Sequence, residues 1–425
     1  MSTAARRALS ELEAWIPPDR LIADPSELRV YECDGLPLHK HPPLAVVLLE
    51  TRDEALLVVD WCRRHGLPFV PRGAGTGLSG GATPLVDCLI VDLNRMRKIK
   101  HVDLENRYAV VEPGLINLRL SEALRGQGFH YAPDPSSQRA CTIGGNVAEN
   151  SGGPHCLKYG MTTDHVLGLE VVLSTGEAVR LGGPHAAAPG LDLRGLFIGT
   201  EGTFGIVTEV TVRLSPDPEE TRTFLAIFDS MRLACRMVAE ITRAGMTPAA
   251  LEILDRLTIE AVEASVFAAG YPKDAAAVLL VELDGFAAEL DDEEPRVREI
   301  AHECGALELR AARDAAERQR LWLGRKGAFG AMGRINTDLY VLDGVVPRTR
   351  LEEVLERVYE IAQRHRVTLS NVFHAGDGNL HPNISYDGRD PDESARVLAA
   401  GKEILQACVD AGGSISGEHG IGLEK

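Results

Sequence analysis

Three glycine-rich segments lie in the first half of the chain, each bounded by predicted β-strands. They are residues 73–81 (GAGTGLSGG), 142–153 (TIGGNVAENSGG) and 199–205 (GTEGTFG). Glycine has no side chain beyond hydrogen, so the backbone of such a segment can come close to a ligand. The first segment alone fits a surface turn equally well. The three together favour one extended ligand with several close backbone approaches, and a dinucleotide fits that better than a mononucleotide.

The first segment is neither a Rossmann motif nor a P-loop, although Gly75-x-Gly77-x-x-Gly80 satisfies the GxGxxG pattern. A Rossmann motif follows a strand and opens a helix. Here the predicted helix, residues 53–65, precedes the glycines, and the strand at 88–93 follows too soon for another helix. No Gly-Lys-Ser/Thr closes the segment, which excludes a P-loop. A nest of backbone amides for phosphate oxygens remains consistent with it, and the lack of a Rossmann unit argues against bound NAD.

Length, charge and cysteine spacing limit the class of protein. With 425 residues the chain is too long for one hydrophobic core, so two domains are expected. A net charge of −17 argues against a nucleic-acid-binding protein or a polybasic membrane anchor. No apolar run reaches the roughly 18–20 residues of a membrane span, and the N-terminus lacks the apolar core of a signal peptide. The eight widely spaced cysteines predict reduced thiols in the cytoplasm rather than iron–sulfur ligands.

The composition changes after Leu214, where the sequence SPDPEET has the character of a linker. Glycine-rich strands precede it, and helices alternating with short strands follow it, which predicts a sheet with helices packed on it. We therefore expect an N-terminal helical segment at 1–40, a first domain at 41–216 and a second domain at 217–425. The helices expected in the second domain are 231–244, 254–269, 293–304, 311–328, 349–365 and 392–411.

The segment richest in candidate catalytic and metal-binding side chains is His374-Ala-Gly-Asp-Gly-Asn-Leu-His381. The Gly-Asp-Gly turn predicts a hairpin-like reversal that brings both imidazoles within reach of one ion. Further on, Glu418 and His419 lie between glycines, where the backbone can aim both side chains. Two histidines and a glutamate leave an open coordination position, as in catalytic metal sites. The alternative is that the histidines are simply solvated or packed, just as Arg325 fits a solvated helix face.

Four ordered motifs resemble one family of flavoproteins. They are PRGAGTGLSG at 71–80, PDPSS at 133–137, TIGGNVA at 142–148 and GTEGTFGIV at 199–207. Together they resemble the FAD-binding domain of the vanillyl-alcohol oxidase/p-cresol methylhydroxylase flavoproteins. Within that family, roughly residues 40–425 are similar to the 2-hydroxy-acid dehydrogenase branch. This branch contains D-lactate dehydrogenases, D-2-hydroxyglutarate dehydrogenases and the catalytic flavoprotein of glycolate oxidase, to which the chain is most similar.

The resemblance implies an α+β protein of two domains. A p-cresol methylhydroxylase-type FAD-binding domain would be followed by a substrate domain with an antiparallel sheet and flanking helices. In the first domain, the first loop would hold the pyrophosphate of FAD, and the later motifs would line the ribityl chain and the isoalloxazine. Some relatives attach FAD to a histidine in the first loop, but residues 71–80 contain no histidine or cysteine, so non-covalent FAD is expected. The residues expected to contact FAD are Pro71, Arg72, Gly73, Ala74, Gly75, Thr76, Gly77, Leu78, Ser79, Gly80, Asp134, Ser136, Ser137, Thr142, Gly144, Gly145, Asn146, Ala148, Asn150, Gly152, Glu201, Gly202, Ile206 and Val207.

The resemblance also assigns roles to the cluster in the second domain. In the 2-hydroxy-acid branch, residues matching His374, His381 and Glu418 bind a divalent metal, for which zinc, manganese and iron are all candidates. The residue matching His419 acts at the substrate, where it would take the hydroxyl proton as general base. Arg325 is assigned to the substrate carboxylate, for which a guanidinium is suited.

The sequence departs from the pattern of the branch in two places. Val341 and Phe329 lie near the positions where hydroxyglutarate enzymes have a lysine and a threonine for a second carboxylate. This favours a small monocarboxylate such as glycolate or D-lactate. The chain also stops at Lys425, whereas relatives continue for several dozen residues, so the second domain is expected to lack its final segment.

The expected function is FAD-dependent oxidation of a small 2-hydroxy acid to the 2-oxo acid, with hydride transfer to the flavin N5. Two alternatives stay open. One is a non-catalytic FAD-binding subunit of a glycolate oxidase complex, which the intact histidines and Glu418 argue against. The other is a metal-dependent hydrolase in which the glycine segments are only turns. By resemblance, a second FAD-domain subunit and an iron–sulfur subunit are expected partners, and they would place this cytoplasmic chain at the inner face of the membrane.

Overall fold

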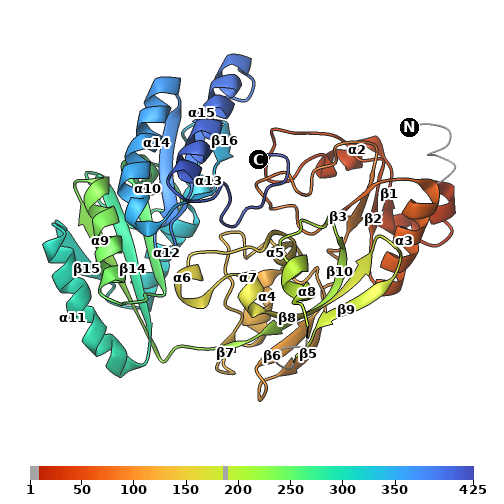
Figure 1. The fold of residues 1–425 in the computed structure, drawn as a ribbon, viewed down its shortest axis with the longest axis horizontal. Coiled ribbons are helices and arrows are strands. Elements are labelled where there is room, and N and C mark those ends of the chain that lie inside the picture. The colour runs from red at the N-terminus through yellow and green to blue at the C-terminus, as the bar shows by residue number, and fades with distance from the viewer. Residues whose placement is uncertain (1–8, 185–189) are drawn as a thin grey trace. The chain divides into compact units, whose positions relative to one another are not determined.

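The structure, a computed structural model, describes residues 9–184 and 190–425 of the chain. These residues form two units, which Figure 1 shows coloured along the chain from red to blue. Unit 1 comprises the described parts of 1–153 and 160–217 together with 418–425. Unit 2 comprises 154–159 and 218–417.

The expected N-terminal helical segment, residues 1–40, is only partly described, because residues 1–8 lie outside the described residues. Its described part includes the four-residue helix α2 (Pro25–Leu28). The Asp24 carboxylate accepts a hydrogen bond from the backbone N–H of Ser26 and so caps the start of this helix.

Unit 1 contains a small sheet in which β2 and β3 both pair with β4 in parallel. Helix α3 (Arg52–His65) connects β2 to β3, close to the helix that the sequence predicts. Thr51 caps its start, and Gly66 ends it with a positive φ of 63°. Trp61 on its buried face packs with the strands in one apolar core. The strands, in order across the sheet, are β1 (Leu21–Ile22), β2 (Ala45–Leu48), β4 (Leu89–Asp92) and β3 (Phe69–Arg72).

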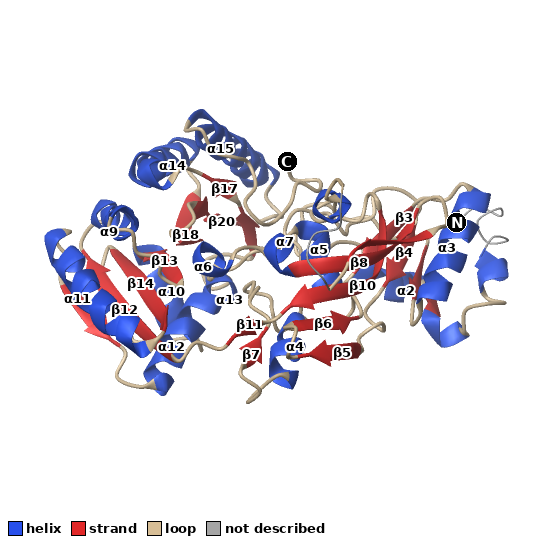
Figure 2. Cartoon of the chain, turned by 60° about the horizontal axis from the view of Figure 1, so that its bottom comes forward, coloured by secondary structure: helices blue, strands red, loops and turns tan. Residues whose placement is uncertain are grey.

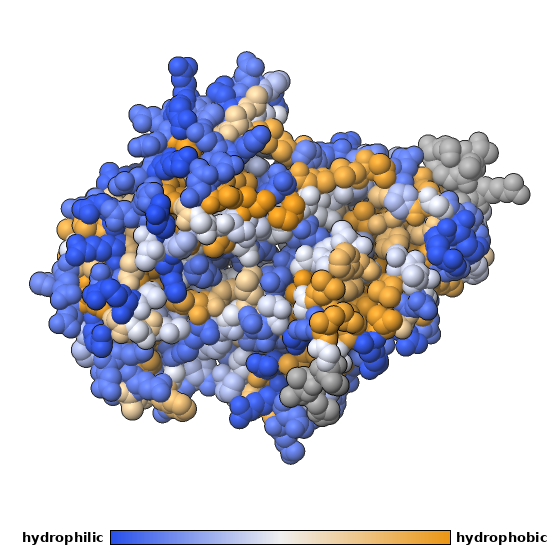
Figure 3. Space-filling view, in the orientation of Figure 1, coloured by the Kyte–Doolittle hydropathy of each residue, from blue (hydrophilic) through white to orange (hydrophobic). Residues whose placement is uncertain are grey.

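A five-stranded antiparallel sheet forms the second layer of unit 1, with its own apolar core. Its strands, in order, are β5 (Ile99–Asp103), β6 (Tyr108–Val111), β10 (Gly205–Arg213), β8 (Val166–Leu173) and β9 (Ala178–Gly182). The strands β7 (Phe129–His130) and β11 (Ser215–Pro216) form a separate pair. The short helices of these segments are α4 (Asn117–Ala123), α5 (Ile143–Glu149), α7 (Thr162–His165) and α8 (Leu193–Phe197). Figure 3 shows hydrophobic surface over α8, where Leu191, Leu193 and Leu196 are exposed.

The expectation that strands bound all three glycine-rich segments is correct only for the first, which lies between β3 and β4. A helix, Cys156–Tyr159, follows the second segment, and α8 precedes the third. The second segment itself forms helix α5. The Thr142 side chain accepts a hydrogen bond from the Gly145 backbone N–H at 3.2 Å, which caps the helix start. Asn150, with a positive φ of 51°, ends it. A polar cap and a left-handed end therefore outweigh the low helix propensity of two adjacent glycines.

Unit 2 is built on a nine-stranded antiparallel sheet, as expected for the second domain of an α+β protein. Its longest pairing joins β12 and β14 over nine residues. Along its main order the strands are β15 (Glu308–Ala311), β12 (Glu220–Phe228), β14 (Ala277–Gly285), β13 (Ala250–Asp255), β18 (Thr368–His374), β19 (Asn379–Leu380) and β17 (Gly344–Val345). Beside β18 lie β20 (Pro382–Tyr386) and, paired to it, β16 (Asp338–Val341).

Helices flank this sheet, and Figure 2 shows α9 and α11 side by side over its strands. The helices are α9 (Met231–Arg243), α10 (Arg256–Glu263), α11 (Ala287–Glu303), α12 (Ala315–Lys326), α13 (Ala328–Met332), α14 (Leu351–His365) and α15 (Pro391–Asp410). The expected helix at 254–269 is too long, because the Glu263 carboxylate accepts the backbone N–H groups of Ala269, Gly270 and Tyr271 and turns the chain. Among the described residues, none of the helices combines the length and apolar character needed to span a bilayer.

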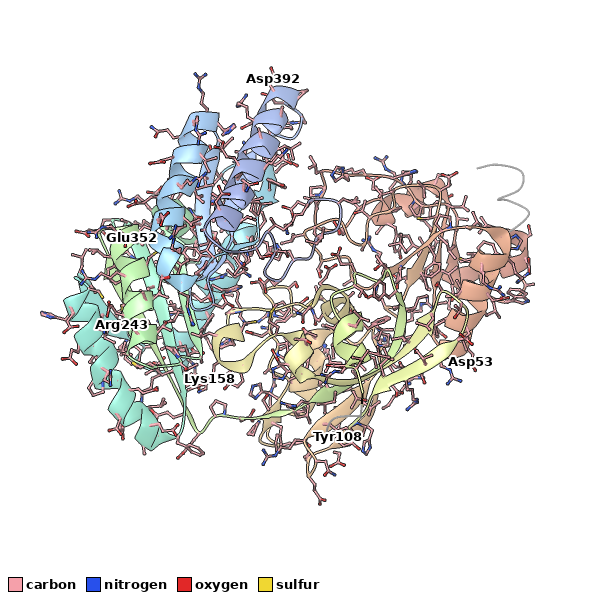
Figure 4. All side chains as sticks on the ribbon, in the orientation of Figure 1. Asp53, Tyr108, Lys158, Arg243, Glu352 and Asp392 are labelled. Carbon is pink, nitrogen blue, oxygen red and sulfur yellow. The ribbon has the colours of Figure 1, made fainter. Side chains whose placement is uncertain are left out.

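One short segment from the first half of the chain belongs to unit 2. Helix α6 (Cys156–Tyr159) contacts β13. Lys158 on this helix, labelled in Figure 4, donates to the Asp284 carboxylate at 2.5 Å. The Tyr159 hydroxyl donates to the same carboxylate, also at 2.5 Å. Charge-assisted hydrogen bonds thus attach α6 to the end of β14.

Candidate active site

The first glycine-rich loop is wrapped around a buried arginine. Strand β3 ends at Arg72, whose guanidinium donates to the backbone carbonyls of Ala82 at 3.0 Å and Cys33 at 2.9 Å. Gly75 has a positive φ of 67°, and a Cβ there would collide with Arg72 Nη2. Burial lowers the pKa of this guanidinium below its ordinary value. Arg72 is expected to contact FAD, but two of its side-chain nitrogens bind backbone carbonyls and so stabilise the shape of the loop.

The start of α5 lies against this loop. A Cβ on Gly73 would collide with Oγ1 of Thr142, the residue that caps α5. Within α5, a Cβ on Gly144 would lie 2.6 Å from the Pro113 side chain. Both glycines are therefore required for close packing at the start of α5.

The third segment contributes backbone and one carboxylate. Glu201, with a positive φ of 52°, accepts the backbone N–H groups of Ile421 and Gly422, each at 2.7 Å. The side chains of Ile206 and Val207, both expected to contact FAD, lie instead in the apolar cores of unit 1.

The C-terminal residues of the chain run along the first glycine loop within unit 1. The Ser79 hydroxyl donates to the backbone carbonyl of His419 at 2.8 Å, and the Ser79 carbonyl accepts the N–H of Leu423 at 2.7 Å. Glu418 Oε1 lies 3.8 Å from His419 Nε2. The structure thus brings the proposed base, His419, next to a loop residue expected to contact FAD.

In unit 2, the histidine motif forms the reversal that the sequence predicts. Strand β18 ends at His374, which pairs with Asn379 at the start of β19, and Gly378 turns the chain with a positive φ of 81°. The rings of His374 and His381 are both buried, with centroids 5.0 Å apart and planes at 87°. The expectation of a hairpin that brings the two imidazoles together is confirmed.

A buried carboxylate links this hairpin to Arg325. Glu252 on β13 is fully buried, and its Oε2 accepts a hydrogen bond from Arg325 Nε at 2.6 Å and forms an ion pair with Arg325 Nη2 at 2.5 Å. Its other oxygen, Oε1, lies 2.7 Å from His374 Nδ1. Arg325 is also fully buried, so the interpretation of this arginine as part of a solvated helix face is wrong. Its Nη1 has no hydrogen-bond partner among the described residues.

A second buried carboxylate, that of Asp343, lies near His381. Asp343 Oδ1 is 3.9 Å from His381 Nδ1, which also lies 3.3 Å from the Leu342 carbonyl. The other oxygen of Asp343 accepts the Ser416 hydroxyl at 2.7 Å and the Gly417 N–H at 3.0 Å. In the sequence, Gly417 is followed directly by Glu418. Neither Glu252 nor Asp343 is part of a motif that the sequence analysis singles out.

Comparison with known proteins identifies the family. Residues 43–182 match the family described as "FAD binding domain", and residues 217–425 match "FAD linked oxidases, C-terminal domain". The glycolate oxidase subunit GlcD of Escherichia coli is 47% identical over 417 residues, which cover 98% of this chain and 83% of that protein. The chain belongs to the FAD-linked oxidases. This confirms the resemblance, makes the protein an FAD-dependent oxidoreductase and excludes the hydrolase alternative.

Two further comparisons agree. A D-lactate dehydrogenase of Archaeoglobus fulgidus is 32% identical to this FAD-linked oxidase, over 89% of this chain and 83% of that protein. The crystal structure of p-cresol methylhydroxylase with substrate bound has a TM-score of 0.83 and 20% identity, and covers 98% of this chain and 89% of that one. The second comparison shows the fold alone, a two-domain p-cresol methylhydroxylase-type fold, as the sequence predicts.

In this FAD-linked oxidase, the residues of each unit fit the group expected there: the pyrophosphate of FAD in unit 1 and a divalent metal in unit 2. In unit 1, a Cβ added at Gly73 would collide with Thr142 and one added at Gly75 with Arg72, so loop 73–80 requires bare backbone there, which suits a pyrophosphate held by backbone amides. In unit 2, the Leu342 carbonyl can only accept, so His381 donates from Nδ1 and keeps the Nε2 lone pair for a metal. The expected metal ligands are divided between the units: His374 and His381 belong to unit 2, and Glu418 belongs to unit 1.

Proposed function

We propose that this FAD-linked oxidase oxidises a small 2-hydroxy acid, such as glycolate or D-lactate, to the 2-oxo acid. The observation that carries the proposal is the buried Nη1 of Arg325, which has no partner among the described residues. A buried N–H without an acceptor is costly, and a carboxylate matches the guanidinium fork. The relatives named glycolate oxidase subunit and D-lactate dehydrogenase support a substrate of this size.

The cofactor, in this proposal, is non-covalent FAD bound by the domain at 41–216 through the residues expected above. Bound FAD would supply the acceptor for the hydride that leaves the substrate Cα. The absence of histidine and cysteine from residues 71–80 supports non-covalent binding. The domain at 217–425 would present Arg325 to the substrate carboxylate.

The proton chemistry belongs to the histidine cluster. A divalent zinc, manganese or iron ion on His374, His381 and Glu418 would make the substrate hydroxyl more acidic. His419 takes the hydroxyl proton onto a ring nitrogen, and the Cα hydrogen then departs with its electron pair, leaving the C=O bond of the 2-oxo acid. The buried pair His374 and His381 and the two carboxylates beside it support this assignment.

An anaerobic titration with substrates tests the proposed function. The purified protein should show a flavin absorption band that glycolate or D-lactate bleaches, with L-lactate as the stereochemical comparison. The reason is that hydride transfer to FAD removes the oxidised flavin spectrum. A flavin band that none of the three acids bleaches would favour the non-catalytic subunit alternative.

Removal of the two unit 2 histidines tests the metal. The double variant His374→Ala/His381→Ala should lose nearly all bound metal while it keeps FAD, because the histidines lie in a different unit from the flavin loop. Metal and flavin per chain are measured by elemental analysis and absorbance. The matched control, His302→Ala/His365→Ala, removes two histidines of unit 2 that lie outside the hairpin. Full metal content in the first variant would contradict the ligand assignment.

Partner subunits are the last part of the proposal. A relative that is 47% identical is named a subunit of glycolate oxidase. The exposed leucines at and before α8 offer an apolar surface of the kind found at protein interfaces. We propose association with a second FAD-domain subunit and an iron–sulfur subunit, which would carry electrons onward at the inner face of the membrane.

A further inference from the structure

Glu252 joins His374 to Arg325 through its two carboxylate oxygens. It lies on β13, directly across from His374 on β18 in the register of the two strands. All six residues of β13 are buried, so this carboxylate is shielded from water. One oxygen serves the guanidinium of Arg325, and the other lies 2.7 Å from His374 Nδ1.

The short contact fixes which nitrogen of His374 carries the proton. Two acceptors would repel each other at 2.7 Å, so the proton must lie between Glu252 and Nδ1. Arg325 Nη2 lies farther from Nδ1, at 3.3 Å, and its positive charge favours a carboxylate that accepts from His374. With Nδ1 protonated, the Nε2 lone pair of His374 is available to a metal, in the same sense as at His381.

The same carboxylate fixes the guanidinium. Two of its three nitrogens, Nε and Nη2, are held by Glu252, so the plane of Arg325 cannot rotate freely. The third nitrogen, Nη1, is thereby left buried and without a partner among the described residues. We propose that Glu252 is a positioning residue that sets the metal-binding tautomer of His374 and aims Arg325 at the substrate carboxylate. This inference rests on the proposed function.

A neighbouring carboxylate provides a matched control. Glu282 on β14 lies in the same sheet and is nearly as buried. It accepts from Trp322 Nε1 at 2.6 Å and lies 3.2 Å from His155 Nε2, so it also serves an aromatic donor and an imidazole. None of these partners is a residue of the proposed site. Any effect that comes only from the loss of a buried carboxylate should therefore appear equally in Glu282→Gln and Glu252→Gln.

The test measures Zn²⁺ affinity and KM for glycolate, because a purely structural role of Glu252 would not change both together. Full-length, flavin-containing protein is stripped of metal by a chelator and titrated with Zn²⁺, and KM is measured for glycolate. Glu252→Gln should weaken Zn²⁺ binding roughly 10- to 100-fold and also raise KM, because its amide cannot accept from both partners. Glu282→Gln should change neither. Glu252→Asp, which keeps the charge one methylene farther back, should lie between wild type and Glu252→Gln.

A measurement on the wild-type protein covers the case in which the variants fail to fold. In protein labelled with ¹⁵N-histidine, the His374 signal, assigned by its loss in His374→Gln, should report a proton on Nδ1. A proton on Nε2, or wild-type Zn²⁺ affinity and KM in Glu252→Gln, would overturn the role of Glu252. If wild-type protein neither binds Zn²⁺ nor oxidises glycolate or D-lactate, the proposed function fails, and the tautomer alone decides whether Glu252 orients His374.

Discussion

The His419→Ala variant is expected to bind FAD as the wild type does and to reduce it roughly 10²- to 10⁴-fold more slowly with substrate. The substrate hydroxyl must lose its proton as the hydride leaves, and His419 is the proposed acceptor. FAD binding should survive, because Ser79 holds the backbone carbonyl of His419 and not its ring. Stopped-flow recording of the flavin band under anaerobic conditions measures the rate, and flavin per chain measures the binding.

The control for His419 is another histidine of unit 1. His130 lies 3.0 Å from the Asp217 carboxylate and belongs to none of the glycine segments. His130→Ala should reduce flavin at the wild-type rate. If His419→Ala also did so, another group would have to take the proton, and the assignment of His419 would be wrong. If His419→Ala lost its flavin, its ring would have a role in holding the loop instead.

Local sequence patterns predict the parts of this site that lie within one loop. The Gly-Asp-Gly turn between His374 and His381 specifies a tight reversal, and the structure contains it. Glycines at 73–81 predict a loop of bare backbone, and the collision of an added Cβ at Gly75 with Arg72 explains why the residue is glycine. Such features depend on turn chemistry over a few residues, which the sequence displays directly.

Parts that depend on strand pairing are not visible in the sequence. Glu252 meets His374 only because β13 pairs with β18, from which it is separated by more than a hundred residues. The one available indication is that Glu252 interrupts the otherwise apolar residues 250–254, since a buried carboxylate requires a partner. The sequence does not say which partner. Arg325 shows the same limit, because its helix pattern fits a solvated face until Glu252 is placed beside it.

Helix α5 shows a different limit. Two glycines and two asparagines within 142–150 favour a turn by propensity alone. The Thr142 cap and close packing against Pro113 decide for a helix. The capping residue, Thr142, is adjacent in the sequence. Pro113, which packs closely against Gly144 of the helix, comes from a separate segment.

Replacement of Arg325 should have the largest combined effect on stability and binding. In Arg325→Met, Glu252 becomes a buried charge without its cation, and loss of one partner of a buried pair costs about 3–5 kcal/mol of unfolding free energy. The variant also loses the proposed carboxylate contact, worth about 1.5–3 kcal/mol for a charged hydrogen bond. That corresponds to roughly 10- to 100-fold weaker substrate binding. Thermal unfolding and anaerobic titration with glycolate measure the two effects.

Arg325→Lys separates the two effects, because a lysine keeps the positive charge beside Glu252 but lacks the planar fork. It should recover much of the stability that Arg325→Met loses and still bind substrate weakly. Arg320→Met, an exposed arginine on the same helix, controls for loss of an arginine from α12. Wild-type substrate affinity in both Arg325 variants would show that the unpartnered Nη1 does not serve the substrate. A stability loss without an affinity loss would then limit Arg325 to the buried ion pair with Glu252.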